Sequence, residues 1–210
     1  MGIIPLCNGM QGTEITYHKL TTEGNLMDTT DIIYNYAQKL DCDARRFEPM
    51  SRHTSFKIGG KADVYIKVTN LSQLMKILKE CDACKEKYIL LGNGSNVLVP
   101  DEGIHGTVLR LDGDFRNISL IDDTTIYCGA GAALGSLCKF AQKCGLSGLE
   151  FAWGIPGTVG GAVFMNAGAY GGEMKDVVYS VSHITQNGDI GRTEAENLEF
   201  GYRTSVYRKN

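Results

Sequence analysis

The stretch from Gly148 to Glu173 limits what this chain can fold into more than any other part of the sequence. It reads GLEFAWGIPGTVGGAVFMNAGAYGGE, so glycine is interleaved with large apolar residues such as Trp153 and Phe164, and charge is almost absent. A flexible linker would lack those apolar side chains. Glycine permits positive φ and lets backbone N–H groups approach a ligand that a Cβ would keep away. The stretch therefore predicts a buried turn that lines a ligand site.

Composition narrows the classes of protein that fit. The 210 residues are 43% hydrophobic and 21% charged, with a net charge of −3, which is ordinary globular composition. No Lys/Arg cluster favours a nucleic-acid partner, and no apolar run approaches the roughly 20 residues of a membrane span. The N-terminus lacks a secretory signal pattern. We expect a cytoplasmic protein without nucleic-acid or membrane partners.

The cysteines favour reduced thiols. There are seven, an odd and scattered set, which does not suit a disulfide framework. Cys81 and Cys84 form a Cys-x-x-Cys pair, but no second ligand pair stands at a usable spacing for zinc. The pair also falls late in a helical pattern, where a redox motif is not expected. We therefore expect no metal site.

Hydrophobic periodicity predicts the elements of a first lobe over residues 28–100. Residues 1–27 are polar and without period, which predicts a disordered extension. The pattern then predicts a helix from about residue 28 to 40, an alternating strand over 62–68, a helix over 71–84 and a strand buried on both faces over 88–91. A strand–helix–strand unit of this length favours a parallel pair with a right-handed crossover. Extended structure is expected to resume at Val97–Val99.

A second lobe is expected over residues 101–210. Its predicted elements are strands over 107–111, 118–121 and 125–128, a helix over 134–144, and strands over 177–185 and 189–193 joined by an Asn187-Gly188 turn. A short helical turn is expected over 194–198. We expect these strands to form a mixed sheet with short helices. The two lobes together indicate an α+β fold.

The loop Gly92-Asn93-Gly94-Ser95-Asn96 follows the predicted strand at residues 88–91 directly. Two glycines allow successive N–H groups to form an anion-binding nest, and Ser95 with the two asparagines adds side-chain donors. The loop lacks the lysine of a P-loop and is not followed by a helix, so it fits neither common nucleotide fingerprint. A tight turn between strands explains the same residues, and both interpretations stay open.

A second glycine loop lies inside the opening stretch, in the segment WGIPGTVGGA. Pro156 fixes φ, and Gly160-Gly161-Ala162 would let a helix begin with its N–H groups bare toward a pyrophosphate. A close-packed helix crossing explains the same glycines. Two such loops in one chain favour an extended ligand that carries a diphosphate and flat rings. The candidate ligand-binding residues of this loop are Gly154, Ile155, Pro156, Gly157, Gly160, Gly161 and Ala162.

Two further motifs carry candidate chemistry. In Tyr202-Arg203-Thr204-Ser205, an arginine between an aromatic residue and hydroxyls could hold a carboxylate or phosphate with two hydrogen bonds. A surface salt bridge is the alternative for Arg203. His53, just before a strand, is interpreted as a hydrogen-bonding residue rather than a base.

Four segments, taken in order, resemble the UDP-N-acetylenolpyruvoylglucosamine reductase family of bacterial peptidoglycan synthesis. They read HTSFKIGGKA, LGNGSNVLV, GLEFAWGIPGTVGGAVFMNAGAYGGE and FGYRTSVYR, and they cover roughly residues 45–210. The segment Asn166–Glu173 is similar to the family's type II branch. The resemblance implies a two-lobed FAD-binding fold of the vanillyl-alcohol-oxidase (PCMH) type. It also implies FAD held by the Gly92–Asn96 and Gly154–Ala162 loops.

The resemblance implies reduction of a UDP-sugar, UDP-N-acetylenolpyruvoylglucosamine, with hydride from NADPH passed through the flavin. It makes Arg203 the catalytic arginine, which faces the substrate carboxylate and stabilises the enolate-like intermediate. It implies substrate contacts for Tyr202 and Asn166. Neither glycine loop contains histidine or cysteine, so we expect non-covalent FAD. We also expect a monomer.

The chain departs from the family at its end. The family continues into a substrate-binding domain with a serine proton donor and a late catalytic glutamate, and neither motif is matched up to Asn210. Ser205 is no substitute, because it belongs to the arginine motif. We therefore expect a C-terminally truncated flavin domain without that substrate domain. The alternatives are a non-catalytic FAD-binding module and another flavin oxidoreductase of the same fold.

Overall fold

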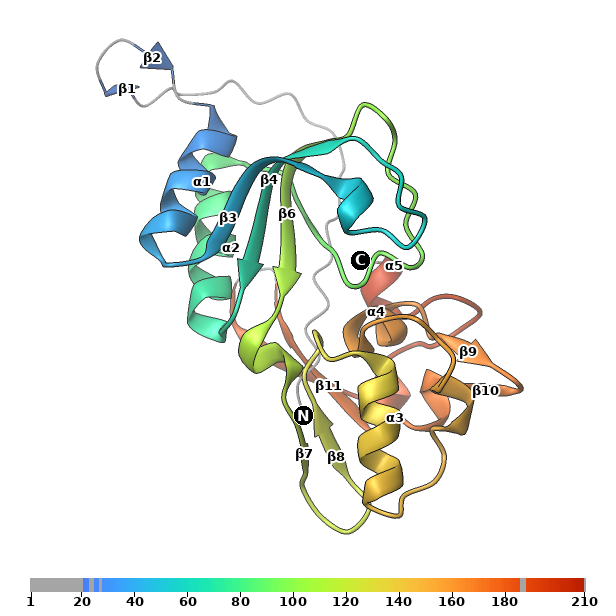
Figure 1. Cartoon of the computed structure of the whole chain (residues 1–210). Helices are drawn as coiled ribbons and strands as arrows, with labels where there is room; N and C mark the ends of the chain where they lie inside the picture. The colour runs from blue at the N-terminus through green and yellow to red at the C-terminus, as the bar shows by residue number, and fades with distance from the viewer. Residues whose placement is uncertain (1–20, 23–24, 27, 186–187, 210) are drawn as a thin grey trace.

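The structure is a computed structural model that describes residues 21–22, 25–26, 28–185 and 188–209. It contains two lobes, one above the other in Figure 1. The extension expected over residues 1–27 lies outside the described residues, except for an antiparallel pair of β1 (Thr21–Thr22) and β2 (Asn25–Leu26).

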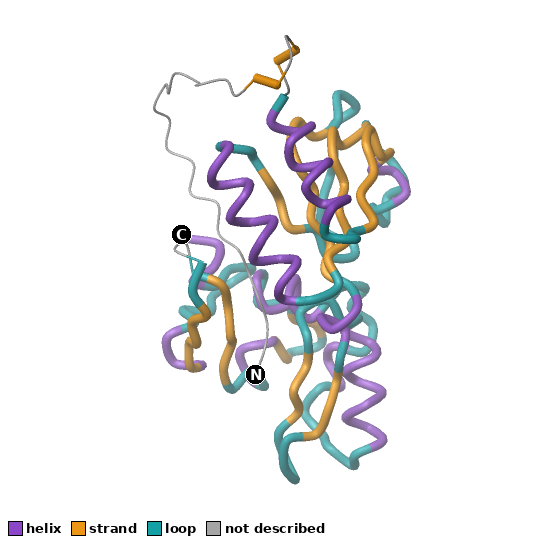
Figure 2. Tube along the Cα trace, turned by 90° about the vertical axis from the view of Figure 1, so that its left-hand side faces the viewer, coloured by secondary structure: helices purple, strands orange, loops and turns teal. Residues whose placement is uncertain are grey.

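The first lobe is a four-stranded sheet in the order β3-β4-β6-β5, with α1 and α2 side by side on one face (Figures 1 and 2). Strand β3 runs antiparallel to β4, and β6 runs parallel to both β4 and β5. The elements are α1 (Thr29–Lys39), β3 (Asp43–Pro49), the 3-10 turn η1 (Met50–Arg52), β4 (Lys61–Val68), α2 (Leu71–Cys84), β5 (Tyr88–Leu90) and β6 (Ile104–Leu111).

Helix α2 forms where its sequence pattern predicts. The Asn70 side chain accepts a hydrogen bond from the Gln73 N–H at 2.9 Å and caps the first turn. Leu74, Ile77, Leu78 and Cys81 recur at helical spacing and are all buried against the rest of the lobe.

Two expectations for this sheet were wrong in detail. Strand β4 does not alternate, since Val64, Tyr65 and Ile66 are all 0% exposed. The reason is that α1 and α2 cover one face of β4, while Met50 and Leu91 pack with Tyr65 in a second apolar cluster. Strand β5 is not buried on both faces.

Strand β5 lies at the edge of the sheet, and its Ile89 is 39% exposed. The two strands of the β4–α2–β5 unit are parallel, but they are not neighbours, because β6 inserts between them. The boundary expected at residue 100 therefore falls inside the connection between two strands of one sheet. Val97–Val99 is irregular rather than extended strand, with Val99 buried.

The second lobe contains three separate antiparallel pairs, β7-β8, β9-β10 and β11-β12, instead of the expected mixed sheet. Short connections join β7 to β8 and β9 to β10, and helical segments separate the three pairs along the chain. The elements are η2 (Gly113–Arg116), β7 (Ile118–Leu120), β8 (Ile126–Cys128), α3 (Leu134–Lys143), η3 (Glu150–Ala152), α4 (Val159–Phe164), β9 (Gly168–Ala169), β10 (Gly172–Glu173), η4 (Met174–Asp176), β11 (Ser180–Ile184), β12 (Ile190–Glu194), η5 (Ala195–Asn197) and α5 (Val206–Lys209). Asn187, from the expected β11–β12 turn, lies outside the described residues.

One apolar cluster runs through both lobes. It joins buried residues of the first sheet, such as Val68 and Leu111, to residues of the second lobe, such as Leu134 and Val163. The lobes are thus packed together through burial of apolar surface. Among the described residues, no helix is long and apolar enough to cross a membrane.

A buried carboxyl group lies beside the helix face of the first lobe. Glu86 is 8% exposed, and its carboxylate accepts hydrogen bonds from the hydroxyls of Thr29 and Thr107. Desolvation raises the pKa of Glu86 above its ordinary value, and the two threonine hydrogen bonds only partly oppose that rise. The ionised form is therefore less favourable in the folded chain than in the unfolded one.

We predict that Glu86→Gln flattens the dependence of stability on pH. Because the folded pKa is raised, the folded chain binds more protons than the unfolded chain, and the free energy of unfolding falls as pH rises through that pKa. At pH 7 to 8 the variant should be more stable than the unaltered chain, and the difference should shrink toward pH 4.

Urea unfolding at several pH values measures this, with the exposed Glu102→Gln as a matched control. Equal pH dependence in all three proteins would contradict the prediction.

Candidate functional site

The two glycine loops, far apart in sequence, meet in the structure. A Cβ added to Gly92 would lie 2.6 Å from the Thr158 Oγ1, and one added to Gly157 would lie 3.8 Å from the Ser95 Oγ. The first loop leaves the edge strand β5, and the second precedes α4. The backbone at Gly92 can reach Thr158 only because glycine has no side chain.

The first loop takes a conformation that requires glycine at its centre. Gly94 has φ of +62°, and its Cβ would lie 2.0 Å from the His53 carbonyl oxygen. The Ser55 N–H donates to the Gly94 carbonyl at 3.1 Å. No described residue accepts a hydrogen bond from the backbone N–H groups of residues 92–96. These donors match the requirement of an anion-binding nest.

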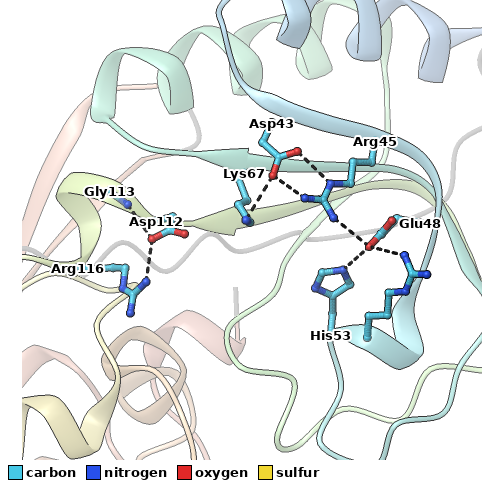
Figure 3. Close-up of polar contacts among 9 residues, drawn as sticks. Asp43, Arg45, Glu48, His53, Lys67, Asp112, Gly113 and Arg116 are labelled. Carbon is cyan, nitrogen blue, oxygen red and sulfur yellow. Dashed lines mark hydrogen bonds and ion pairs between the residues drawn. The ribbon is translucent and has the colours of Figure 1, made fainter.

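The segment that supports Gly94 is held by an ion-pair network, drawn in Figure 3. The His53 Nε2 lies 2.9 Å from the Glu48 Oε1, and Glu48 is 5% exposed. The His53 ring stacks on Tyr65 with centroids 4.2 Å apart. His53 is thus a hydrogen-bonding residue, as expected from the sequence. Burial raises the pKa of Tyr65 to about 12, and its hydroxyl has no hydrogen-bond partner among the described residues.

Sequence reasoning missed one residue that touches the first loop. The Arg110 Nη1 donates to the Gly92 carbonyl at 2.7 Å, and its Nη2 donates to the Asn93 Oδ1 at 3.0 Å. Arg110 lies in β6, inside a strand pattern that carries no signal of a ligand site. Only the parallel pairing of β5 with β6 brings it beside the loop.

The second loop does not present bare helix N–H groups, which corrects the expectation for Gly160-Gly161-Ala162. The Val159 and Gly160 N–H groups donate to the carbonyls of Ala132 and Ala130, both at 2.9 Å, and the Gly161 N–H donates to the Thr158 Oγ1 at 3.3 Å. These donors are occupied because a preceding segment crosses the start of α4.

That segment is Gly129–Ala133, which the sequence analysis did not single out. A Cβ on Gly160 would lie 2.9 Å from the Ala130 Cβ, so this glycine serves close packing. The small-residue run GAGAA was the available signal. In the second loop, Gly154 and Pro156 remain exposed, while Ile155 and Gly157 are half-buried and Ala162 is buried.

Arg203 lies at the tip of a tight turn and reaches the first loop. Gly201 and Thr204 bond to each other across the turn, and Arg203 has φ of +55°. Its Nη2 donates to the Asn96 Oδ1 at 3.1 Å. Tyr202, beside it, is 95% exposed. The structure therefore brings the arginine motif and the first glycine loop together, and leaves the tyrosine in solvent.

Asn166 lies inside the protein rather than at its surface. It is 2% exposed, its Nδ2 donates to Glu173 and to the Gly201 carbonyl, and its Oδ1 accepts from the Lys175 N–H at 3.0 Å. These bonds tie the start of the arginine turn to the segment after α4. Through its bond to the Gly201 carbonyl, Asn166 helps to hold the turn that carries Arg203.

Comparisons with known proteins agree with this geometry. The family described as FAD binding domain matches residues 62–194. The UDP-N-acetylenolpyruvoylglucosamine reductase of Clostridioides difficile is 45% identical over 185 residues, which are 88% of this chain and 60% of that protein. That of Heliobacterium modesticaldum is 46% identical over 75% of this chain and 50% of its own length. The chain thus spans between half and three fifths of these relatives.

Solved structures show the same similarity. The UDP-N-acetylenolpyruvylglucosamine reductase of Thermus caldophilus superposes with a TM-score of 0.65 at 38% identity, covering 78% of this chain and 56% of that one. The BBE-like 1 protein of Physcomitrella patens superposes with a TM-score of 0.56 at 17% identity, covering 78% of this chain and 38% of that one. At that identity only the fold is shared.

We predict that Gly94→Ala destabilises the chain by more than about 2 kcal/mol, because the new Cβ meets both an unfavourable φ and the His53 carbonyl. Gly145→Ala is the matched control: Gly145 has φ of +72° and nothing within 4 Å of its Cβ. Its cost should be about 1 kcal/mol, from φ alone. Chemical unfolding compares the two, and equal costs would refute the contact with His53.

Proposed function

This chain belongs to the FAD binding domain family, and from that premise we propose that it binds FAD without a covalent bond, beside the two glycine loops. Its fold is the two-lobed α+β FAD-binding fold of the vanillyl-alcohol-oxidase type, as expected. Its resemblance to the UDP-N-acetylenolpyruvoylglucosamine reductases is confirmed over the part of them that it spans.

The observation that carries the proposal is the meeting of the Gly92–Asn96 loop with both the Gly154–Gly157 segment and Arg203. A Cβ at Gly92 would meet the Thr158 side chain and one at Gly94 the His53 carbonyl, and the loop's N–H groups have no described acceptor. Such a cradle fits a pyrophosphate. The loop's Ser95 and asparagine side chains supply further donors.

The Gly160-Gly161-Ala162 segment is not assigned to contact the cofactor. Its N–H groups are used within the protein, so it supports the second loop through close packing instead of donating to the cofactor. Exposed Gly154 and Pro156, with half-buried Ile155, form the part of that loop that remains available to a flat ring.

We propose that the substrate is the UDP-sugar UDP-N-acetylenolpyruvoylglucosamine and that NADPH is the reductant, as in an enzyme of peptidoglycan synthesis. FAD, when bound, supplies the centre that accepts and donates hydride. The Arg203 guanidinium attracts the enolpyruvyl carboxylate and stabilises negative charge that develops next to it. Exposed Tyr202 offers an aromatic face to the same ligand. Asn166 holds the turn that carries both residues.

Proton donation is assigned to none of the residues around Arg203. Ser205 is 0% exposed, and its hydroxyl donates to the Phe164 carbonyl at 2.9 Å, so its proton is already used within the fold. The proposal therefore gives this chain cofactor binding, carboxylate binding and charge stabilisation. Turnover of the whole enzyme also needs a general acid.

We predict that the purified chain binds FAD at one site. Added FAD should lose fluorescence on titration with the chain, and acid precipitation should release the flavin into the supernatant, because no covalent bond holds it. Absorbance spectra of the supernatant measure the released fraction. A colourless chain that does not quench added FAD would overturn the proposed function. FAD binding without NADPH oxidation would favour the non-catalytic module.

We predict that Arg203→Ala weakens binding of the UDP-sugar by about 10- to 100-fold while leaving FAD content within about twofold, because a charge-assisted carboxylate contact is lost. The perturbation of the flavin absorbance by UDP-N-acetylenolpyruvoylglucosamine measures that affinity. Arg192→Ala, an exposed arginine on β12 that pairs with Glu194, is the matched control.

The two roles open to Arg203 give different results. If Arg203→Ala lost FAD and substrate affinity equally, the arginine would act by supporting the first loop through Asn96, and not by binding the carboxylate.

A further inference from the structure

Arg110 makes an unusual set of contacts for a partly buried arginine. It extends from β6, on the same face as Val108, since side chains alternate along a strand. Its guanidinium forms no ion pair with any described carboxylate. Its hydrogen-bond partners among the described residues are two oxygens of the first glycine loop, the Gly92 carbonyl at 2.7 Å and the Asn93 Oδ1 at 3.0 Å. The half-buried Arg110 guanidinium thus contacts this loop and no described carboxylate.

These contacts determine which way a backbone donor points. The peptide between Gly92 and Asn93 is trans, and in a trans peptide the carbonyl and the following N–H point in opposite directions. Because Arg110 holds the Gly92 carbonyl on the side of the sheet, the Asn93 N–H is directed away from the sheet.

A second peptide of the loop is held in the same manner. The Gly94 carbonyl accepts from the Ser55 N–H at 3.1 Å, so the Ser95 N–H points away from Ser55. Neither the Asn93 nor the Ser95 N–H has an acceptor among the described residues. The Gly92 and Gly94 carbonyls are thus fixed by hydrogen bonds from Arg110 and Ser55. The N–H groups of the residues that follow them remain available to a ligand.

We propose that Arg110 is a positioning residue that pre-organises the Gly92–Asn96 loop for the pyrophosphate of the cofactor. This inference rests on the proposed function and adds the residue on which recognition of the phosphates depends. The planar guanidinium contacts the carbonyl and the amide oxygen with two different nitrogens, whereas a lysine has a single nitrogen and matches this fork poorly. Its positive charge also favours an anion beside the loop.

The test measures the affinity of three ligands for each of four proteins. These are the unaltered chain, Arg110→Met, Arg110→Lys and the control Lys67→Met. Lys67 pairs with Arg110 in the register of β4 and β6, carries the same charge, and contacts Asp43 instead of the loop. FAD and ADP carry the pyrophosphate, and riboflavin carries only the ring system. Calorimetric or fluorescence titration gives the three dissociation constants.

Arg110→Met should weaken the binding of FAD and of ADP by the same factor, roughly 10- to 100-fold, and leave the affinity for riboflavin within about twofold. Arg110→Lys should recover part of the loss, since lysine can still reach one oxygen. Lys67→Met should bind all three ligands as the unaltered chain does. The thermal midpoint without ligand is measured for each variant, because general damage to the fold would weaken riboflavin as well.

The outcomes separate this inference from the proposed function. If the unaltered chain binds FAD and Arg110→Met binds it equally well, the role of Arg110 is refuted and the proposed function stands. Equal loss of ADP and riboflavin would also refute it, because Arg110 would then act through the fold. If the unaltered chain binds neither FAD nor ADP, both proposals fall.

Discussion

The candidate site depends on backbone that approaches other atoms more closely than any side chain permits. At Gly92 the nearest obstacle to a Cβ is the Thr158 hydroxyl, and at Gly94 it is the His53 carbonyl. The same holds at Gly160, where Ala130 is the obstacle. A Cβ at Gly92 would force the two lobes apart, and a Cβ at Gly94 or Gly160 would displace a neighbouring segment of the same lobe. At Gly92 the absence of a side chain therefore lets the lobes pack closely beside a loop whose N–H groups have no described acceptor.

Ion pairs and hydrogen bonds then orient the segments that the glycines allow to pack closely. Glu48 holds His53 under Gly94, and Arg110 holds the Gly92 carbonyl from the sheet. On the other side, the Asn166 amide fixes the turn that carries Arg203, whose guanidinium returns to Asn96. Two partly buried networks, one from each lobe, thus end on the same five-residue loop. The loop proposed to hold the cofactor is thus also the loop that Arg203 contacts.

Sequence patterns predicted the elements whose structure depends on residues close together in the chain. Helices α2 and α3 form where periodicity predicts them, because their buried faces are encoded every three or four residues. The position of β5 at the sheet edge could not be read from its apolar run, because it depends on β6 pairing between β4 and β5. The occupied N–H groups of α4 also depend on a segment some thirty residues earlier, Gly129–Ala133.

The sequence by itself indicated the fold class, the two glycine loops and the arginine motif, since the motifs that carry them are contiguous in the chain. It could not show that the loops touch, that Arg110 holds one of them, or that Asn166 is buried beneath the turn. Those facts arise from pairing between distant segments, and hydrogen bonds of this kind exist only once the chain has brought carbonyl and donor within about 3 Å. Tertiary structure alone decided which of the candidate residues share one site.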